Sequence, residues 1–126
     1  MYQTITTNVM VNNVKETIDF YHDVLGFEVI LTVPGTNEEF QFAIIQKDSI
    51  SLMLQSKKTL IEEYESLATD TIKPSFTLYI TVDDVEKQYE ELRNKAALAK
   101  ELHKTFYGKP EFAIFDNNGN ILTISC

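Results

Sequence analysis

The segment Val11-Asn12-Asn13-Val14 decides the fold, because it recurs as Val82-Asp83-Asp84-Val85 at an offset of 71 residues. A second pair of segments, Phe42-Ala43-Ile44-Ile45 and Phe112-Ala113-Ile114-Phe115, recurs at an offset of 70 residues. Each similarity is short, but the two offsets agree within one residue. An internal repeat determines the overall architecture of a chain. We therefore predict two copies of one small module.

Strands are predicted wherever polar and apolar residues alternate, because successive side chains of a strand point to opposite faces. Residues 75–82 read Ser-Phe-Thr-Leu-Tyr-Ile-Thr-Val, which is the clearest alternation in the chain. Residues 49–55 alternate in the same way, and the pattern is looser over 4–11 and 121–126. Further strands are expected at 28–33, 40–46 and 111–116.

Helices are predicted where apolar residues recur with helical spacing. The first stripe is Val14, Ile18, Tyr21 and Leu25, and the second is Val85, Tyr89, Leu92 and Ala96. Asn13 and Gly26 stand where the first helix needs its caps. The run from Ala96 to Lys100 favours an extension of the second helix, which leaves His103 in a loop. A shorter helix is expected over 60–67.

Because the two halves repeat, each is predicted to follow the order β-α-β-β-β, and the fold class is α+β. The modules are expected at about residues 1–68 and 69–126. A single module of this size leaves one sheet face without cover, so the two are expected to pair. The predicted architecture is a curved mixed sheet with helices on one face and a concave cup on the other.

The alternation also predicts which residues occupy each face. One set is almost wholly apolar and is expected beneath the helices: Ile50, Leu52, Leu54, Phe76, Leu78, Ile80, Val82, Leu122 and Ile124. The opposite set has intermediate polarity and no charge: Thr6, Asn8, Met10, Ser51, Met53, Gln55, Thr77, Tyr79, Thr81 and Thr123. Such a mixed surface favours binding of small organic molecules. The alternative is an ordinary threonine-rich exposed face, since threonine favours strands.

The composition excludes several classes of partner. The 126 residues include 11 basic and 19 acidic side chains, for a net charge of −8. This charge argues against a nucleic-acid backbone and against an anionic membrane surface. The single cysteine, Cys126, excludes an intrachain disulfide and suits a reducing compartment. No apolar run approaches the ~20 residues of a membrane helix, so a cytoplasmic location is expected.

Several motifs resemble the vicinal oxygen chelate superfamily, the group of glyoxalases, bleomycin-resistance proteins and extradiol dioxygenases. The segment from Val11 to Tyr21, followed by Val24-Leu25-Gly26-Phe27, is similar to the strand–helix signature of that family. Tyr79 to Val85 and the closing Asp116-Asn117-Asn118-Gly119-Asn120 add to the likeness. The resemblance extends over essentially the full chain, and it implies the same paired-module fold.

Enzymes of that family hold a divalent metal with histidine and glutamate ligands, one from each of four strands. The resemblance places those positions at Thr6, Met53, Thr77 and Thr123. Neutral hydroxyls and a thioether are poor ligands for Mg²⁺, Mn²⁺, Zn²⁺ or Ni²⁺. We therefore predict no metal, no cofactor and none of the metal-dependent lyase, isomerase or oxygenase chemistry of the family.

The predicted site is consequently one for binding, with no catalytic residue. Its aromatic members are Tyr79, Tyr107 and Phe112, and for Phe112 an ordinary core position is the equal alternative. The ligand-binding set is Thr6, Asn8, Met53, Thr77, Tyr79, Tyr107, Phe112 and Thr123.

The sequence favours metal-independent binding or sequestration of a small organic molecule by a homodimer, as in the bleomycin-resistance branch. The negative charge favours a cationic ligand, and the tyrosines of the site favour an aromatic one. Two alternatives remain: a glyoxalase-type or dioxygenase-type enzyme with displaced ligands, and a dimeric interaction module with a vestigial cup.

Overall fold

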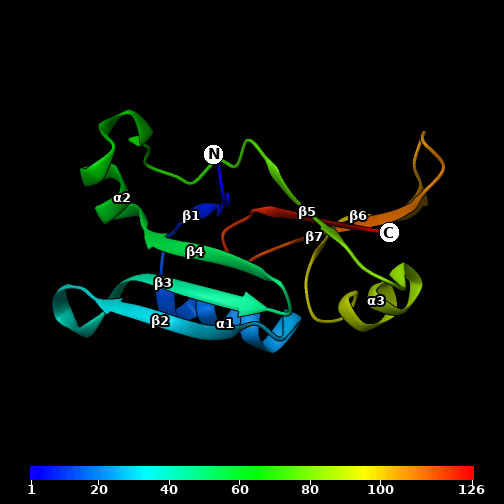
Figure 1. The fold of residues 1–126 in the computed structure, drawn as a ribbon, viewed down its shortest axis with the longest axis horizontal. Coiled ribbons are helices and arrows are strands. Elements are labelled where there is room, and N and C mark those ends of the chain that lie inside the picture. Colours follow the sequence, from blue (N-terminus) through cyan, green and yellow to red (C-terminus); the bar gives the residue numbers. More distant parts are fainter. The chain divides into compact units, whose positions relative to one another are not determined.

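The computed structural model describes residues 1–126 as two compact units. Unit 1 comprises Met1–Ile72 and unit 2 comprises Lys73–Cys126. Each unit contains a four-stranded mixed sheet with helices, in the order β-α-β-β-β (Figure 1). The predicted α+β class with two such modules is confirmed.

Unit 1 has the strand order β1-β4-β3-β2. β1 and β4 are parallel, and the other two pairs are antiparallel. Its elements are β1 (Asn8–Val11), α1 (Val14–Leu25), β2 (Glu28–Pro34), η1 (Thr36–Glu38), β3 (Phe40–Lys47), β4 (Ile50–Ser56), α2 (Lys57–Glu63) and η2 (Glu65–Leu67).

Unit 2 repeats this arrangement with the strand order β5-β8-β7-β6. β5 and β8 are the parallel pair. Its elements are β5 (Thr77–Thr81), α3 (Val85–Leu92), β6 (Leu98–Lys104), β7 (Pro110–Phe115) and β8 (Ile121–Ser125).

The strand registers of the two units are equivalent. Asn8 lies opposite Met53 in unit 1, and Tyr79 lies opposite Thr123 in unit 2. These pairs are related by the same offsets of 71 and 70 residues that relate the repeated segments. The duplication seen in the sequence is therefore present in the hydrogen-bonded pairing of both sheets.

Both longer helices begin at the residue that the repeat supplies as a cap. The Asn13 side chain accepts a 2.9 Å hydrogen bond from the Glu16 amide, and Asp84 accepts one of 3.1 Å from the Lys87 amide. Helix α1 ends at Leu25 and is capped by Gly26, whose φ of 78° is left-handed and suits a residue without a Cβ. The predicted caps of this helix are confirmed.

Each sheet buries one face beneath a helix. In unit 1, α1 packs on β3 and β4, and its fully buried Tyr21 meets Phe27 edge to face at 5.5 Å. In unit 2, Leu122 and Ile124 are buried as predicted. Two members of the predicted core, Ile50 and Phe76, are instead 42% and 41% exposed, because each stands at or just before the start of its strand.

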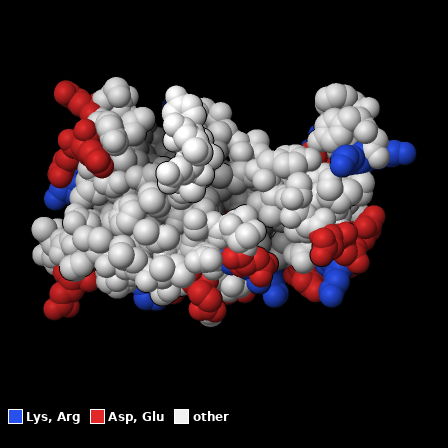
Figure 2. Space-filling view, in the orientation of Figure 1, with Lys and Arg blue, Asp and Glu red and all other residues white.

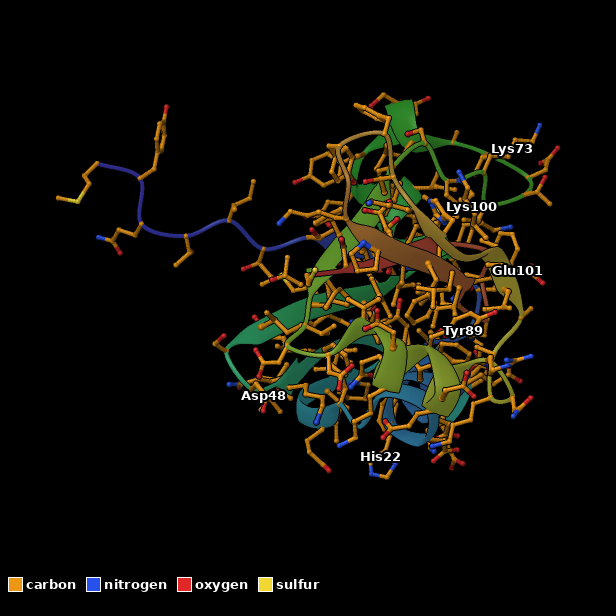
Figure 3. All side chains as sticks on the ribbon, turned by 90° about the vertical axis from the view of Figure 1, so that its right-hand side faces the viewer. His22, Asp48, Lys73, Tyr89, Lys100 and Glu101 are labelled. Carbon is orange, nitrogen blue, oxygen red and sulfur yellow. The ribbon has the colours of Figure 1, made fainter.

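The predicted elements are wrong at several places. Helix α3 ends at Leu92, and the last three residues of the stretch expected to extend it begin strand β6 at Leu98. His103 therefore lies in a strand and not in a loop. Strand β1 begins at Asn8 rather than at residue 4, and Figure 3 shows the preceding residues as an extended segment.

Helix α2 begins earlier than residue 60, where the sequence pattern placed it. The Ser56 side chain caps it by accepting a 3.3 Å hydrogen bond from the Thr59 amide. The helix ends at Glu63, and a separate 3-10 turn follows.

None of the helices is long and apolar enough to span a membrane.

Candidate functional site

The strongest candidate site lies on the face of the unit 2 sheet opposite α3. Tyr79 of β5 pairs with Thr123 of β8, and Thr123 pairs with Ala113 of β7. Residues that pair directly point to the same side of a sheet, and alternate residues share that side. We use the name threonine face for four polar residues of this surface, namely Thr77, Tyr79, Glu111 and Thr123.

Two of its members contact each other directly. The hydroxyls of Thr77 and Thr123 lie 2.8 Å apart and form a hydrogen bond. Each hydroxyl therefore already has a partner, and neither carries charge. The pair provides two neutral polar groups on this face.

Beside this pair, two phenols and a carboxylate converge. The hydroxyl of Tyr107, in the turn between β6 and β7, donates a 2.5 Å hydrogen bond to Oε2 of Glu111. That bond, together with hydrogen bonding to Tyr79, raises the pKa of Tyr107 well above its ordinary value. The Tyr107 hydroxyl therefore stays protonated and acts as a donor.

Phe112 does not belong to this face. It is fully buried and meets Tyr89 of α3 edge to face at 5.2 Å. Figure 3 labels Tyr89 at α3. Because Phe112 follows Glu111 directly, its side chain points to the opposite side of the sheet, into the core beneath the helix. Of the two positions that the sequence allowed for Phe112, the structure therefore shows the one in the core and not the one in the binding site.

Unit 1 carries the remaining predicted residues. Asn8 is exposed at the start of β1, and half-buried Met53 lies opposite it on β4. Thr6 precedes β1, so its side chain is outside the regular sheet. The Asn8 amide donates a 2.8 Å hydrogen bond to the Gln55 side chain, which in turn donates to Glu63 at 3.2 Å.

Residues at the four positions where the family resemblance implies a metal do not fit that role. In unit 2, Thr77 and Thr123 offer hydroxyls that bond to each other. In unit 1, Met53 offers only a thioether, and Thr6 a further neutral hydroxyl. Divalent metal sites in proteins are built from imidazole, thiolate and carboxylate. No group of three or more histidine, cysteine or acidic side chains in the structure is arranged to hold a metal ion.

Two participating residues were not among the predicted site residues. Glu111 receives the Tyr107 hydroxyl, and Gln55 links Asn8 to α2. Gln55 carries a signal in the sequence, because it alternates with buried Leu54 on a predicted strand. The contact between Glu111 and Tyr107 has no signal in the sequence, since it depends on the conformation of the hairpin that joins β6 and β7.

Exposed acidic side chains gather on a helix of each unit. Figure 2 shows acidic groups over α2 and over α3, and they correspond to exposed glutamates of these helices, among them Glu62, Glu63, Glu90 and Glu91. On the threonine face, Glu111 is the one charged member. The face is thus largely uncharged, with a single acidic group beside two phenols.

Comparison with known proteins identifies the family of this chain and several solved structures with a similar fold. The model of the Glyoxalase/Bleomycin resistance protein/Dioxygenase superfamily matches residues 4–124. An uncharacterized protein of Bacillus subtilis, YraH, is 30% identical over 91 aligned residues, and the alignment covers 69% of this chain and 67% of YraH.

Solved structures of low sequence identity share the fold. A glyoxalase-related enzyme from Fulvimarina pelagi has a TM-score of 0.79 at 16% identity, with 99% of this chain and 88% of that chain covered. A bleomycin-binding protein in complex with bleomycin has a TM-score of 0.70 at 17% identity, with 98% of each chain covered.

Proposed function

Because the chain belongs to the Glyoxalase/Bleomycin resistance protein/Dioxygenase superfamily, we propose that it binds a small organic molecule without a metal ion. The proposed site is the threonine face of unit 2. The observation that carries the proposal is the convergence of Tyr79, Tyr107 and Glu111 beside a neutral threonine pair.

The chemistry of these groups selects an aromatic, positively charged ligand. Tyr79 and Tyr107 are 52% and 48% exposed, so both rings are accessible. Aromatic faces attract cations, and a neighbouring carboxylate adds direct charge attraction. The net charge of −8 favours the approach of a cation. The structural similarity to a bleomycin-binding protein supports the proposal that this chain binds an organic molecule.

The donor groups support metal independence. A catalytic divalent ion needs basic ligands that hold it and leave one position open. The corresponding positions of this chain supply hydroxyls and a thioether, which provide neither charge nor basicity. The alternative, an enzyme with displaced ligands, requires a different group of histidines or carboxylates to hold the metal ion.

We also propose that the protein is a homodimer. Strand β2 lies at the edge of the unit 1 sheet and carries three consecutive exposed aliphatic side chains, Val29, Ile30 and Leu31, at 47%, 58% and 45% exposure. An exposed, apolar edge strand is a common site of association between chains. A second copy would bury this strand. Sedimentation tests the proposal: a single 14.5 kDa species at high concentration would contradict it.

Ligand binding is tested by titrating the protein with benzyltrimethylammonium while the backbone amide signals are followed by NMR. Phenylacetate, which is aromatic but anionic, and tetramethylammonium, which is cationic but not aromatic, are the matched comparisons. The expected result is that benzyltrimethylammonium binds most tightly and shifts the amides of Tyr79 and Glu111. An absence of these shifts at saturating ligand would contradict the proposed site.

Single substitutions test whether Glu111 contacts the bound cation. Glu111→Gln is expected to weaken binding of benzyltrimethylammonium about tenfold, because a charge-assisted contact is lost. Tyr64→Phe alters a tyrosine of similar exposure in unit 1 and is expected to change nothing. Elemental analysis of the purified protein tests metal independence, and a stoichiometric transition metal would contradict it.

A further inference from the structure

We propose that a second site, a cavity in unit 1, binds a small zwitterion such as an amino acid with an aliphatic side chain. The cavity has a volume of about 300 Å³. Its walls come from the connection between β2 and β3 on one side and from α2 on the other. Cavities of roughly this size and above accommodate small organic ligands. None of its lining residues belongs to the threonine face, so the proposal does not depend on the function proposed above.

The cavity is lined by side chains of both charges. Lys57 and Lys58 contribute positive charge, and Glu39 and Glu62 contribute negative charge. The Lys57 amine already donates a 2.7 Å hydrogen bond to the backbone carbonyl of Asp70. The side chains of Lys58, Glu39 and Glu62 make no hydrogen bond or ion pair within the chain. One cation and two carboxylates thus face a shared space without internal partners.

This combination favours a ligand that carries both charges. A ligand carboxylate gains a charge-assisted hydrogen bond from Lys58, and a ligand ammonium gains one from Glu62 or Glu39. A dianion would meet two carboxylates, and a dication would meet two lysines. A free metal cation would find only two carboxylates beside two ammonium groups, and no group of metal-holding residues is present here.

The remaining lining residues give the cavity an apolar side and a fixed wall. The half-buried ring of Phe40 provides a surface for an aliphatic side chain. The wall is held by the turn in which the Gly35 amide donates a 2.6 Å hydrogen bond to the Glu39 carbonyl. A Cβ at Gly35 would lie 3.1 Å from that carbonyl and 3.2 Å from the Cβ of Gln41, so the turn is closely packed.

The test uses L-leucine and two analogues that each lack one charge. Isoamylamine lacks the carboxylate, and 4-methylpentanoate lacks the ammonium. The full chain is titrated with each compound, and backbone amide shifts are followed by NMR. L-leucine is expected to shift the amides of Phe40, Gln41 and Thr59, and each analogue is expected to bind at least about tenfold more weakly.

Substitutions of exposed side chains then identify the charges involved. Lys58→Met and Glu62→Gln are each expected to weaken L-leucine binding about tenfold. Lys95→Met and Glu86→Gln change exposed residues of unit 2 in the same way and are expected to leave binding unchanged. The proposal is overturned if saturating L-leucine leaves the three amides unshifted, or if either analogue binds as tightly. It is also overturned if neither cavity variant weakens binding.

Discussion

The hydroxyl of Tyr107 donates a 2.5 Å hydrogen bond to Oε2 of Glu111. This bond to Glu111 and hydrogen bonding to Tyr79 keep the pKa of Tyr107 above its ordinary value of 10.0. The cause is direct: ionisation would remove the donated proton and place a phenolate beside a carboxylate. At neutral pH, Tyr107 is thus a fixed neutral donor next to a negative acceptor.

Glu111→Gln is predicted to lower the pKa of Tyr107 toward 10.0. The amide oxygen of glutamine is a weaker acceptor than a carboxylate and carries no charge, so the phenolate becomes less unfavourable. The measurement is the near-ultraviolet absorbance of phenolate against pH, with Tyr107→Phe as the reference that isolates this group. Glu101→Gln on β6 is the control, and an unchanged Tyr107 titration in Glu111→Gln would contradict the assignment.

Tyr107→Phe is predicted to lower the free energy of unfolding at neutral pH, and the deficit is predicted to disappear in alkali. The folded pKa of Tyr107 lies above the unfolded value of 10.0, so the stabilisation is fully present below 10.0 and is lost as the pH rises through the folded pKa. Urea unfolding of wild type and variant at neutral pH and above pH 10.0 measures this window. A deficit that stays constant with pH would indicate lost packing alone.

Phe112→Ala is predicted to destabilise the protein by about 3–5 kcal/mol, because it removes a fully buried ring and leaves a cavity. The loss includes the edge-to-face contact with Tyr89. Phe106→Ala is the matched control, since Phe106 is 101% exposed and its removal is expected to cost less than about 0.5 kcal/mol. Equal costs in denaturant unfolding would place Phe112 outside the core.

Asn13→Ala is predicted to destabilise the protein by about 1 kcal/mol through loss of the cap of α1. Asn13→Asp retains an acceptor for the Glu16 amide and is expected to unfold at nearly the wild-type denaturant concentration. Asp84 occupies the repeated position in unit 2, so Asp84→Ala is expected to cost a similar amount. Equal unfolding of Asn13→Ala and Asn13→Asp would show that the cap contributes nothing.

Much of the fold follows from local patterns. Helix α1 was predicted with its caps, because the cap residues and the apolar stripe are all encoded within one short segment. The strands β3, β4, β7 and β8 were predicted within one or two residues, because β4 and β8 alternate and β3 and β7 are short runs rich in apolar residues. The repeat added the βαβββ order of both modules.

Strand β6 could not be predicted from alternation. Its pairing with β7 contains irregularities between Leu98 and Lys100 and between Lys100 and His103. Such irregularities change which side of the sheet successive residues face, so the period of two is lost. The alanines at 96 and 97 also favour a helix locally, whereas the Ala97 carbonyl accepts a 2.9 Å hydrogen bond from the Phe115 amide. Pairing with β7 overrides the local preference.

The candidate site divides in the same way. The sequence alone determined that the four family metal positions hold weak donors and that one sheet face of each module is polar but nearly uncharged, because residue identity and strand period suffice for both. Only the tertiary structure decided that Tyr107 meets Glu111 and Tyr79, and that lysines and glutamates enclose a cavity beside Phe40. Those contacts depend on hairpin conformation and on packing between segments distant in the chain, and neither leaves a periodic trace in the sequence.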